Sequence, residues 1–104
     1  MSDGTCLFII STMVPISIIT IVRNDPDGLR ATAKSVMGQS ISPVEWVVVD
    51  GASGPETQAV LEEIRESCSS LVSEPDSGIY DAMNKGISRS SGHWLMFLNS
   101  GDAL

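Results

Sequence analysis

The feature that most constrains this chain is the recurrence of short, almost continuously apolar runs rich in β-branched residues. Two of them span residues 15–22 and 44–50, a third spans 93–99, and a shorter, less apolar run spans 70–75. Unbroken apolar runs of this length are typical of strands covered on both faces, as in parallel sheets. Segments with helical spacing separate them. We therefore predict an α/β fold of order βαβαβαβ, with an open, mostly parallel sheet and helices on both faces.

The three predicted helices carry start signals or apolar stripes. Asp25 can cap the first helix, with Pro26 at its first position. Ser53 and Glu56 form a capping box for the second helix, with Pro55 in its first turn. The residues expected to face the core are Leu29, Ala33, Val36 and Met37 in the first helix, Val60, Leu61, Ile64 and Cys68 in the second, and Ile79, Ala82, Met83 and Ile87 in the third.

Length and charge limit the function classes. A chain of 104 residues has the size of one domain. Its formal net charge of −7 argues against a nucleic-acid partner. An acidic chain can still bind a phosphorylated ligand when a divalent cation lies between the two sets of negative charge.

Residues 1–14 are interpreted as an extension of a domain that begins at residue 15. The apolar run at 6–22 does not resemble a signal peptide, because no Lys or Arg precedes it and no small-residue cleavage site follows. Pro15 interrupts the run, which is shorter than the roughly 20 residues of a membrane span. We expect Met13 to be the natural start, which the intact mass of natively expressed protein would test. A retained extension is expected to be poorly ordered or to pair as an extra strand.

The cysteines and the histidine do not indicate a metal centre. Cys6 and Cys68 lack metal-ligand spacing, and reduced, buried thiols in a cytosolic protein are the simplest interpretation. His93 begins a predicted strand, where a structural role is the usual one.

The third predicted helix carries more polar chemistry than solubility requires. Tyr80, Asp81, Asn84 and Lys85 lie off its apolar stripe, and Tyr80 and Asn84 share a face at a spacing of four residues. This face is a candidate binding surface. The alternative is a capped surface helix in which Asp81 pairs with Lys85.

Acids and amides follow the carboxyl ends of the predicted strands. In an open α/β sheet these ends form one edge, where ligands bind. The alternative is that such residues only cap strand-to-helix turns. Capping explains Asp25 well but Asp50 poorly, because Ser53 already supplies a cap. The residues concerned are Asn24, Asp25, Asp50, Asp76, Asn99 and Asp102.

Four segments carry a family resemblance. They read ISIITIVRN at 16–24, EWVVVDGAS at 45–53, SEPDSGIYDAMNKG at 73–86 and FLNSGD at 97–102. In this order they resemble the amino-terminal half of a family 2 glycosyltransferase with the GT-A fold. The similarity is to bacterial enzymes that build extracellular and capsular polysaccharides, such as colanic acid, and it covers nearly all of residues 15–104.

The resemblance implies a UDP- or GDP-linked nucleotide-diphospho-sugar donor at the carboxyl edge of the sheet, and a saccharide acceptor. Asp50 matches the family acid that contacts the nucleotide base, and the turn at 21–24 matches the segment beside the base and ribose. Asp102 matches the last acid of the family's Asp-x-Asp region, which would hold Mg2+ or Mn2+ against the diphosphate. The residues implied for donor binding are Asn24, Asp50, Ser53, Asp76, Asp81, Asn84 and Asn99.

Two departures from the family pattern matter. Asn99 and Gly101 occupy positions that are often acidic, so the nucleotide would supply most of the metal ligands. No residue of this chain matches the family's general base, which lies in an acceptor-binding half. Catalytic residues are therefore unassigned, and we expect weak donor binding with little or no sugar transfer by this chain alone.

Two other functions are open. A non-catalytic α/β domain could form a homodimer through an exposed sheet edge. A phosphoacceptor signalling domain is disfavoured, because its lysine should follow a strand and Lys85 lies within a predicted helix. We expect a cytoplasmic location, with peripheral association at the inner membrane as the alternative.

Overall fold

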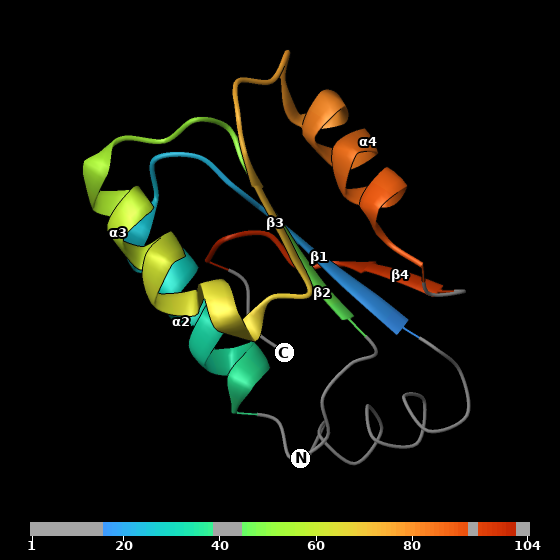
Figure 1. Ribbon diagram of the computed structural model, residues 1–104, viewed down its shortest axis with the longest axis horizontal. Coiled ribbons are helices and arrows are strands. Elements are labelled where there is room, and N and C mark those ends of the chain that lie inside the picture. Colours follow the sequence, from blue (N-terminus) through green and yellow to red (C-terminus); the bar gives the residue numbers. More distant parts are fainter. Residues whose placement is uncertain (1–15, 39–44, 92–93, 102–104) are drawn as a thin grey trace.

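The computed structural model describes residues 16–38, 45–91 and 94–101, and it has the predicted element order (Figure 1). Cys6, His93, Asp102 and the proposed extension at 1–14 lie outside these residues. The elements are β1 (Ile16–Val22), α2 (Pro26–Met37), β2 (Glu45–Asp50), α3 (Pro55–Ile64), the short 3-10 turn η1 (Arg65–Ser67), β3 (Ser70–Ser73), α4 (Ile79–Arg89) and β4 (Trp94–Phe97).

The four described strands form one sheet in the order β3-β2-β1-β4, and every neighbouring pair is parallel. Ile18 of β1 lies opposite Trp46 of β2 on one side and Met96 of β4 on the other. The predicted parallel sheet is confirmed. Crossover helices between parallel strands are what place layers of helix against both faces.

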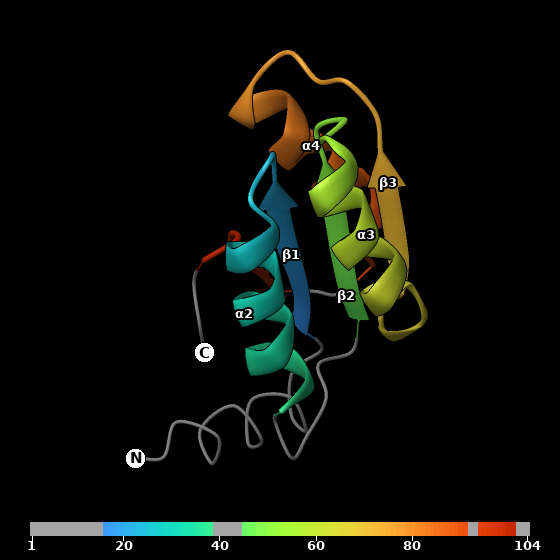
Figure 2. The ribbon, with the colours of Figure 1, turned by 90° about the vertical axis from the view of Figure 1, so that its left-hand side faces the viewer.

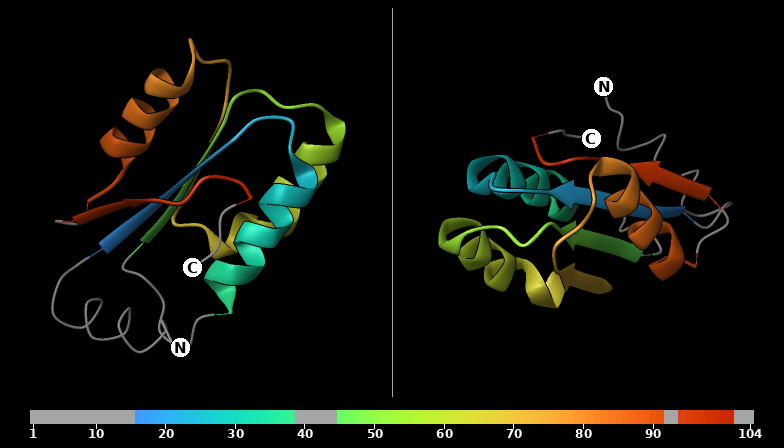
Figure 3. Two further views of the ribbon diagram at one scale, coloured as in Figure 1. Left: turned by 180° about the vertical axis from the view of Figure 1, so that it is seen from behind. Right: turned by 90° about the horizontal axis from the view of Figure 1, so that it is seen from above.

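Helices cover both faces of this sheet, as predicted. α2 and α3 lie side by side against one face, and α4 crosses the other (Figures 2 and 3). β1 contributes side chains to the cores on both faces, because successive side chains of a strand point in opposite directions. Ile18 belongs to the cluster under α2 and α3, whereas Ile19 belongs to the cluster under α4. Burying each of these side chains contributes about 1.5–3 kcal/mol to folding.

The start of α2 follows the sequence prediction. Asp25 is its N-cap, and the carboxylate accepts a hydrogen bond from the Gly28 N–H at 3.1 Å. Pro26 occupies the first position of the helix. The predicted core face was wrong at one residue, because the Met37 side chain is exposed while Thr32 is fully buried. Thr32 is polar yet buried because its hydroxyl makes two hydrogen bonds to the turn after β4.

The predicted core stripe of α4 was wrong in part. Ala82 is buried, but Ile79 and Ile87 are 54% and 43% exposed. Gly86 is the second contact point, since a Cβ at this position would overlap the Cγ2 methyl of Ile19. The helix therefore approaches the sheet through two small residues four positions apart, whereas its larger residues Ile79 and Ile87 stay partly exposed.

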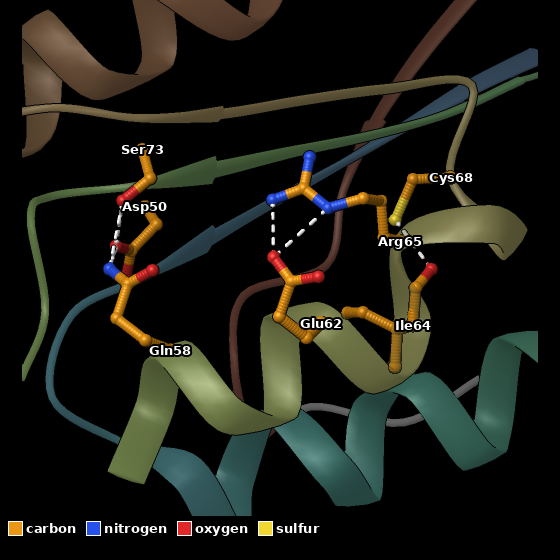
Figure 4. A network of polar contacts seen from close by, with 7 residues as sticks. All are labelled: Asp50, Gln58, Glu62, Ile64, Arg65, Cys68 and Ser73. Atoms are coloured by element: carbon orange, nitrogen blue, oxygen red, sulfur yellow. Dashed lines mark hydrogen bonds and ion pairs between the residues drawn. The ribbon is translucent and has the colours of Figure 1, made fainter. Parts of the chain in front are cut away.

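The second helix also differs from its prediction. Gly54, not Ser53, is the N-cap of α3, and it makes no side-chain capping bond. Cys68 lies beyond the helix, after η1, where its thiol donates a hydrogen bond to the Ile64 carbonyl at 3.3 Å (Figure 4). Burial raises the pKa of the Cys68 thiol to about 11. The predicted core residues Val60, Leu61 and Ile64 are buried.

Candidate functional site

The carboxyl ends of the strands meet at one edge of the sheet. Val22 pairs with Asp50, and Asp50 pairs with Ser73, so β1, β2 and β3 end at the same level. After β4, the Ser100 N–H donates to the Ile21 carbonyl at 3.1 Å, which places the segment containing Asn99 beside the end of β1. The segments that hold Asn24, Asp50, Asp76 and Asn99 therefore come together at this edge.

Asp50 lies inside this edge rather than at its surface. It is fully buried, and its carboxylate accepts four hydrogen bonds. The Gln58 amide at 3.1 Å and the Ser73 hydroxyl at 2.7 Å donate to Oδ2 (Figure 4). The Ser53 N–H also donates to Oδ2, at 2.9 Å, and the Ser53 hydroxyl donates to Oδ1. These bonds use most of the acceptor sites of a carboxylate. A ligand would have to compete with them for Asp50.

The hydrogen bonds of Asp50 show that Ser53 is not the cap of α3 that its sequence position predicted. Ser53 donates both its N–H and its hydroxyl to Asp50 instead of capping α3. Asp50 therefore organises the turn after β2, which is the structural task that the sequence argument had given to Ser53. The contact of Asp50 with a nucleotide base stays a prediction.

Asn24 joins the turn after β1 to the turn after β2. Its N–H donates to the Ser53 hydroxyl at 2.7 Å, and its side-chain oxygen accepts from the Gly54 N–H at 2.8 Å. Asn24 and Ala52 both have left-handed backbone angles, with φ of 49° and 59°. Asparagine tolerates this region better than most residues, so Asn24 suits a tight turn. Both turns are thereby held in one arrangement.

A pocket of about 200 Å³ opens beside these turns. Apolar side chains and backbone form most of its wall, and two opposite charges, Arg23 and Asp76, lie among them. The residues that line it are Ile21, Val22, Arg23, Asp76, Gly78, Ile79 and Ala82. The exposure of Ile79, which contradicted the predicted core stripe, is explained by this position on the pocket wall.

Asp76 is held by the turn that precedes α4. Its Oδ1 accepts a hydrogen bond from the Gly78 N–H at 3.1 Å. Its Oδ2 lies against Gly51, where a Cβ would come within 2.8 Å of this oxygen and 3.5 Å of the Arg23 Cδ. Gly51 is buried, so the lack of a side chain there leaves room for both charged groups.

Asp81 and Asn84 do not line the described pocket. Asp81 accepts a hydrogen bond from the Ser77 N–H at 2.9 Å, and its Oδ2 lies 3.6 Å from the Lys85 ammonium. The predicted pairing of Asp81 with Lys85 is thus present. Asn84 lies with Tyr80 on the exposed face of α4. Their roles in donor binding stay predictions.

The turn that leads to Asp102 is anchored to α2. The Thr32 hydroxyl donates to the Asn99 carbonyl at 3.2 Å and accepts from the Gly101 N–H at 2.9 Å. The same N–H contacts the Gly28 carbonyl at 3.0 Å, and Gly101 has a φ of 94°, which favours glycine. These bonds explain the burial of Thr32.

The described ranges contain no cluster of three or more acidic, histidine or cysteine side chains that could hold a metal ion by itself. Asp102, the predicted metal ligand, is outside those ranges. Within the same part of the chain, no helix is both long and apolar enough to cross a bilayer.

Sequence reasoning missed several residues of this edge. Arg23 lines the pocket, and Gly51 leaves room for the Arg23 side chain because it has none of its own. Gln58, near the start of α3, donates a hydrogen bond to Asp50. Arg23 could have been found, because a cation directly after a strand at a ligand-binding edge is a signal. Gly51 and Gln58 give no such signal, since their role depends on distances between separate elements.

Solved glycosyltransferase structures share this fold. The chain matches the mannosyltransferase PcManGT from Pyrobaculum calidifontis, solved in complex with GDP-Man and Mn2+, with a TM-score of 0.74 and 21% identity over 85% of this chain and 28% of that one. Residues 1–349 of TarS from S. aureus match with a TM-score of 0.72 and 24% identity, again over 85% of this chain and 28% of that one.

Curated glycosyltransferases are also similar to this chain in sequence. An uncharacterised glycosyltransferase of Mycobacterium tuberculosis is 47% identical over 88 residues, which are 84% of this chain and 34% of that protein. A PGL/p-HBAD biosynthesis glycosyltransferase of Mycobacterium bovis is 34% identical over 91 residues, 85% of this chain and 36% of that protein. The chain spans about a third of the length of these curated relatives. Residues 17–103 match the model of glycosyl transferase family 2, so the chain belongs to that family.

Proposed function

We propose that this chain is the donor-binding part of a glycosyltransferase that moves a sugar from a nucleotide-diphospho-sugar to a saccharide acceptor in polysaccharide synthesis. The observation that carries the proposal is the pocket at the carboxyl edge of the sheet. It combines apolar walls with one guanidinium and one carboxylate in a chain of family 2. Convergent polar groups in an apolar pocket are typical of small-molecule sites.

The pocket suits the base end of such a donor. Ile21 and Ile79 offer apolar surface to the faces of a flat ring. The Asp76 carboxylate can accept the ring N–H of uracil or guanine, and Arg23 can donate to a base carbonyl or a phosphate oxygen. Asp50 would support this arrangement indirectly, through the turn after β2 that it organises.

We propose that Asp102 holds a divalent cation, Mg2+ or Mn2+, together with oxygens of the donor diphosphate. Because the described residues do not form a metal site of their own, most ligands would come from the nucleotide. PcManGT, a structural relative, was solved with GDP-Man and Mn2+. When bound, such a cation would stabilise the departing nucleoside diphosphate.

The general base is not assigned to a residue of this chain. Asp81 is engaged by the Ser77 N–H and by Lys85, which leaves it poorly suited to abstracting a proton from an acceptor. We therefore expect nucleotide binding without efficient sugar transfer by this chain alone.

Isothermal titration of the full 104-residue chain with UDP and GDP, each with and without Mn2+, tests the proposal. We expect heat for one of the two nucleotides, with tighter binding when Mn2+ is present. Uridine and guanosine, which lack the diphosphate, are the controls and should show no effect of Mn2+. A folded sample that gives no heat with either nucleotide would overturn the proposed function.

A homodimer through the sheet edge is the second candidate, and one observation favours it. β4 pairs only with β1 among the described strands, and its Trp94 side chain is 62% exposed. A free strand edge beside an exposed aromatic ring favours pairing with a second chain. Sedimentation velocity over a range of concentrations should reveal the dimer, and Trp94→Lys should abolish it. A monomer at all concentrations would contradict this candidate.

A further inference from the structure

The segment 74–78 forms one wall of the pocket, and Lys85 of α4 ties it down. The Lys85 ammonium donates to the Pro75 carbonyl at 2.8 Å and lies 3.2 Å from the Glu74 carboxylate. It also lies 3.6 Å from the Asp81 carboxylate on its own helix. One cation thus joins two points of the segment to the start of α4.

The surroundings of Lys85 match the chemistry of an ammonium group. Its three N–H donors face three oxygens, and the side chain is only 21% exposed. Partial desolvation lowers the pKa of Lys85, but the hydrogen bond to Glu74 and the charges of Asp81 and Glu74 raise it by more. Lys85 is therefore a cation at neutral pH.

Without the Lys85 ammonium, two neighbouring carboxylates would have no positive charge between them. The carboxylates of Glu74 and Asp81 both lie within 4 Å of the same point, so they would repel each other. Asp81 holds the Ser77 N–H, and Asp76 holds the Gly78 N–H. A shift of Asp81 or Glu74 would consequently be passed to the backbone between them.

This backbone carries two groups of the pocket wall, Asp76 and Gly78. The Asp76 Oδ2 is packed against Gly51. A small displacement of the segment 74–78 would therefore change the position of this carboxylate on the pocket wall. We propose that Lys85 is a positioning residue for the nucleotide pocket, holding the segment 74–78 so that Asp76 can meet a base. The inference rests on the proposed function.

The two lysines of the chain supply a matched test. Lys85→Met removes the ammonium and keeps an unbranched apolar side chain, Lys85→Arg keeps the charge, and Lys34→Met makes the same change at an exposed position on α2. Amide hydrogen exchange of Ser77 and Gly78, measured by NMR, reports the order of the segment. Calorimetric titration with UDP and GDP measures the nucleotide affinity of the pocket.

We expect Lys85→Met to lose protection at both amides and to weaken nucleotide binding about tenfold, or about 1.4 kcal/mol. Lys85→Arg should restore most of both, and Lys34→Met should match the wild type. Unchanged protection in Lys85→Met would overturn the inference whether or not nucleotide binds. Wild-type affinity in Lys85→Met would overturn it while leaving the proposed function intact. Absence of binding by the wild type would overturn the proposed function and, with it, the nucleotide part of this inference, whereas hydrogen exchange would still decide whether Lys85 holds the segment 74–78.

Discussion

The carboxylate of Asp50, at the end of β2, accepts a hydrogen bond from the hydroxyl of Ser73, at the end of β3, over 2.7 Å. This bond joins two strand ends at the carboxyl edge of the sheet, and neither residue is among those that line the pocket. Together with the bonds from Ser53 and Gln58, it makes Asp50 a structural centre of the carboxyl edge.

Asp50→Asn should destabilise the chain, because it replaces a buried acceptor with a group that must also donate. At the Oδ2 position the new NH2 would face three groups that now donate, and at the Oδ1 position it would displace the bond that the Ser53 hydroxyl donates. We expect a loss of about 2–4 kcal/mol in urea unfolding. Ser73→Ala removes one donor to Asp50 and one acceptor of the Gln58 amide, which keeps its bonds to Asp50 and the Ser53 carbonyl, and should cost about 1 kcal/mol. A stability change in Asp50→Asn no larger than that of Ser73→Ala would contradict the structural role.

Gly86→Ala should destabilise the packing of α4, although alanine favours helices. The added Cβ would overlap the Cγ2 of Ile19, and overpacking of this kind costs about 1–3 kcal/mol. Asn84→Ala, on the exposed face of the same helix, is the control and should leave stability unchanged or slightly higher. The comparison can be made by thermal unfolding, and equal melting temperatures would show that α4 does not approach β1 this closely.

Arg23→Met should weaken nucleotide binding because it removes the guanidinium of the pocket. We expect an affinity about tenfold lower in titration calorimetry, as for the loss of one charge-assisted hydrogen bond. Arg30→Met is the matched control. Arg30 pairs with Glu63 at 3.2 Å on the surface, outside the pocket, so its loss should cost no more than about 1 kcal/mol of stability and leave affinity unchanged. Equal affinities for both variants would remove Arg23 from the site.

Gly51→Ala should affect the pocket more than the fold. Its Cβ would come within 2.8 Å of the Asp76 Oδ2, a group that can swing away but would then leave its place on the pocket wall. We expect nucleotide affinity to fall about tenfold, with the melting temperature lowered by only a few degrees. Gly54→Ala makes only an ordinary contact of 3.7 Å with Asn24 and should retain nucleotide affinity. Wild-type affinity in Gly51→Ala would show that the position of Asp76 is unimportant.

Cys68 should react slowly with thiol reagents below pH 9, and the stability of the fold should decrease in alkali. Burial raises the pKa of its thiol from 9.0 to about 11, so little thiolate forms at neutral pH. The unfolded chain loses this proton near pH 9.0 and the folded chain only near pH 11. The contribution of the thiol to stability is therefore complete below pH 9 and declines towards pH 11. Labelling of a Cys6→Ser variant, folded and in urea, would test this, and equal rates would contradict it.

Much of the fold could be predicted because its signals are local. The unbroken apolar run that became β1 and the Asp25 and Pro26 start of α2 required no knowledge of distant residues. The face of α4 could not be predicted in the same way. Apolar periodicity does not separate Ile79, which lines a pocket, from a residue that faces the core. It also gives Gly86 no weight, although the lack of a side chain there is what lets the helix approach.

The site was predictable at the level of the edge but not of its contacts. Parallel topology alone brings Asn24, Asp50 and Asp76 to the same end of the sheet. Whether an acid there faces a ligand or the protein depends on donors from other elements, such as Gln58 for Asp50. Sequence spacing contains no information on these distances.

The strand order has a consequence for how the chain is made. β1 is the first element described, yet it lies between β2 and β4, and its Ile16 pairs with Trp94 near the other end of the sequence. During synthesis on the ribosome, β1 can pair with β2 early, but its second side must wait until β4 has emerged. Pairing between such distant segments slows folding and exposes apolar strand surface in the interval. The nascent chain should therefore depend on chaperones most strongly just before β4 is complete.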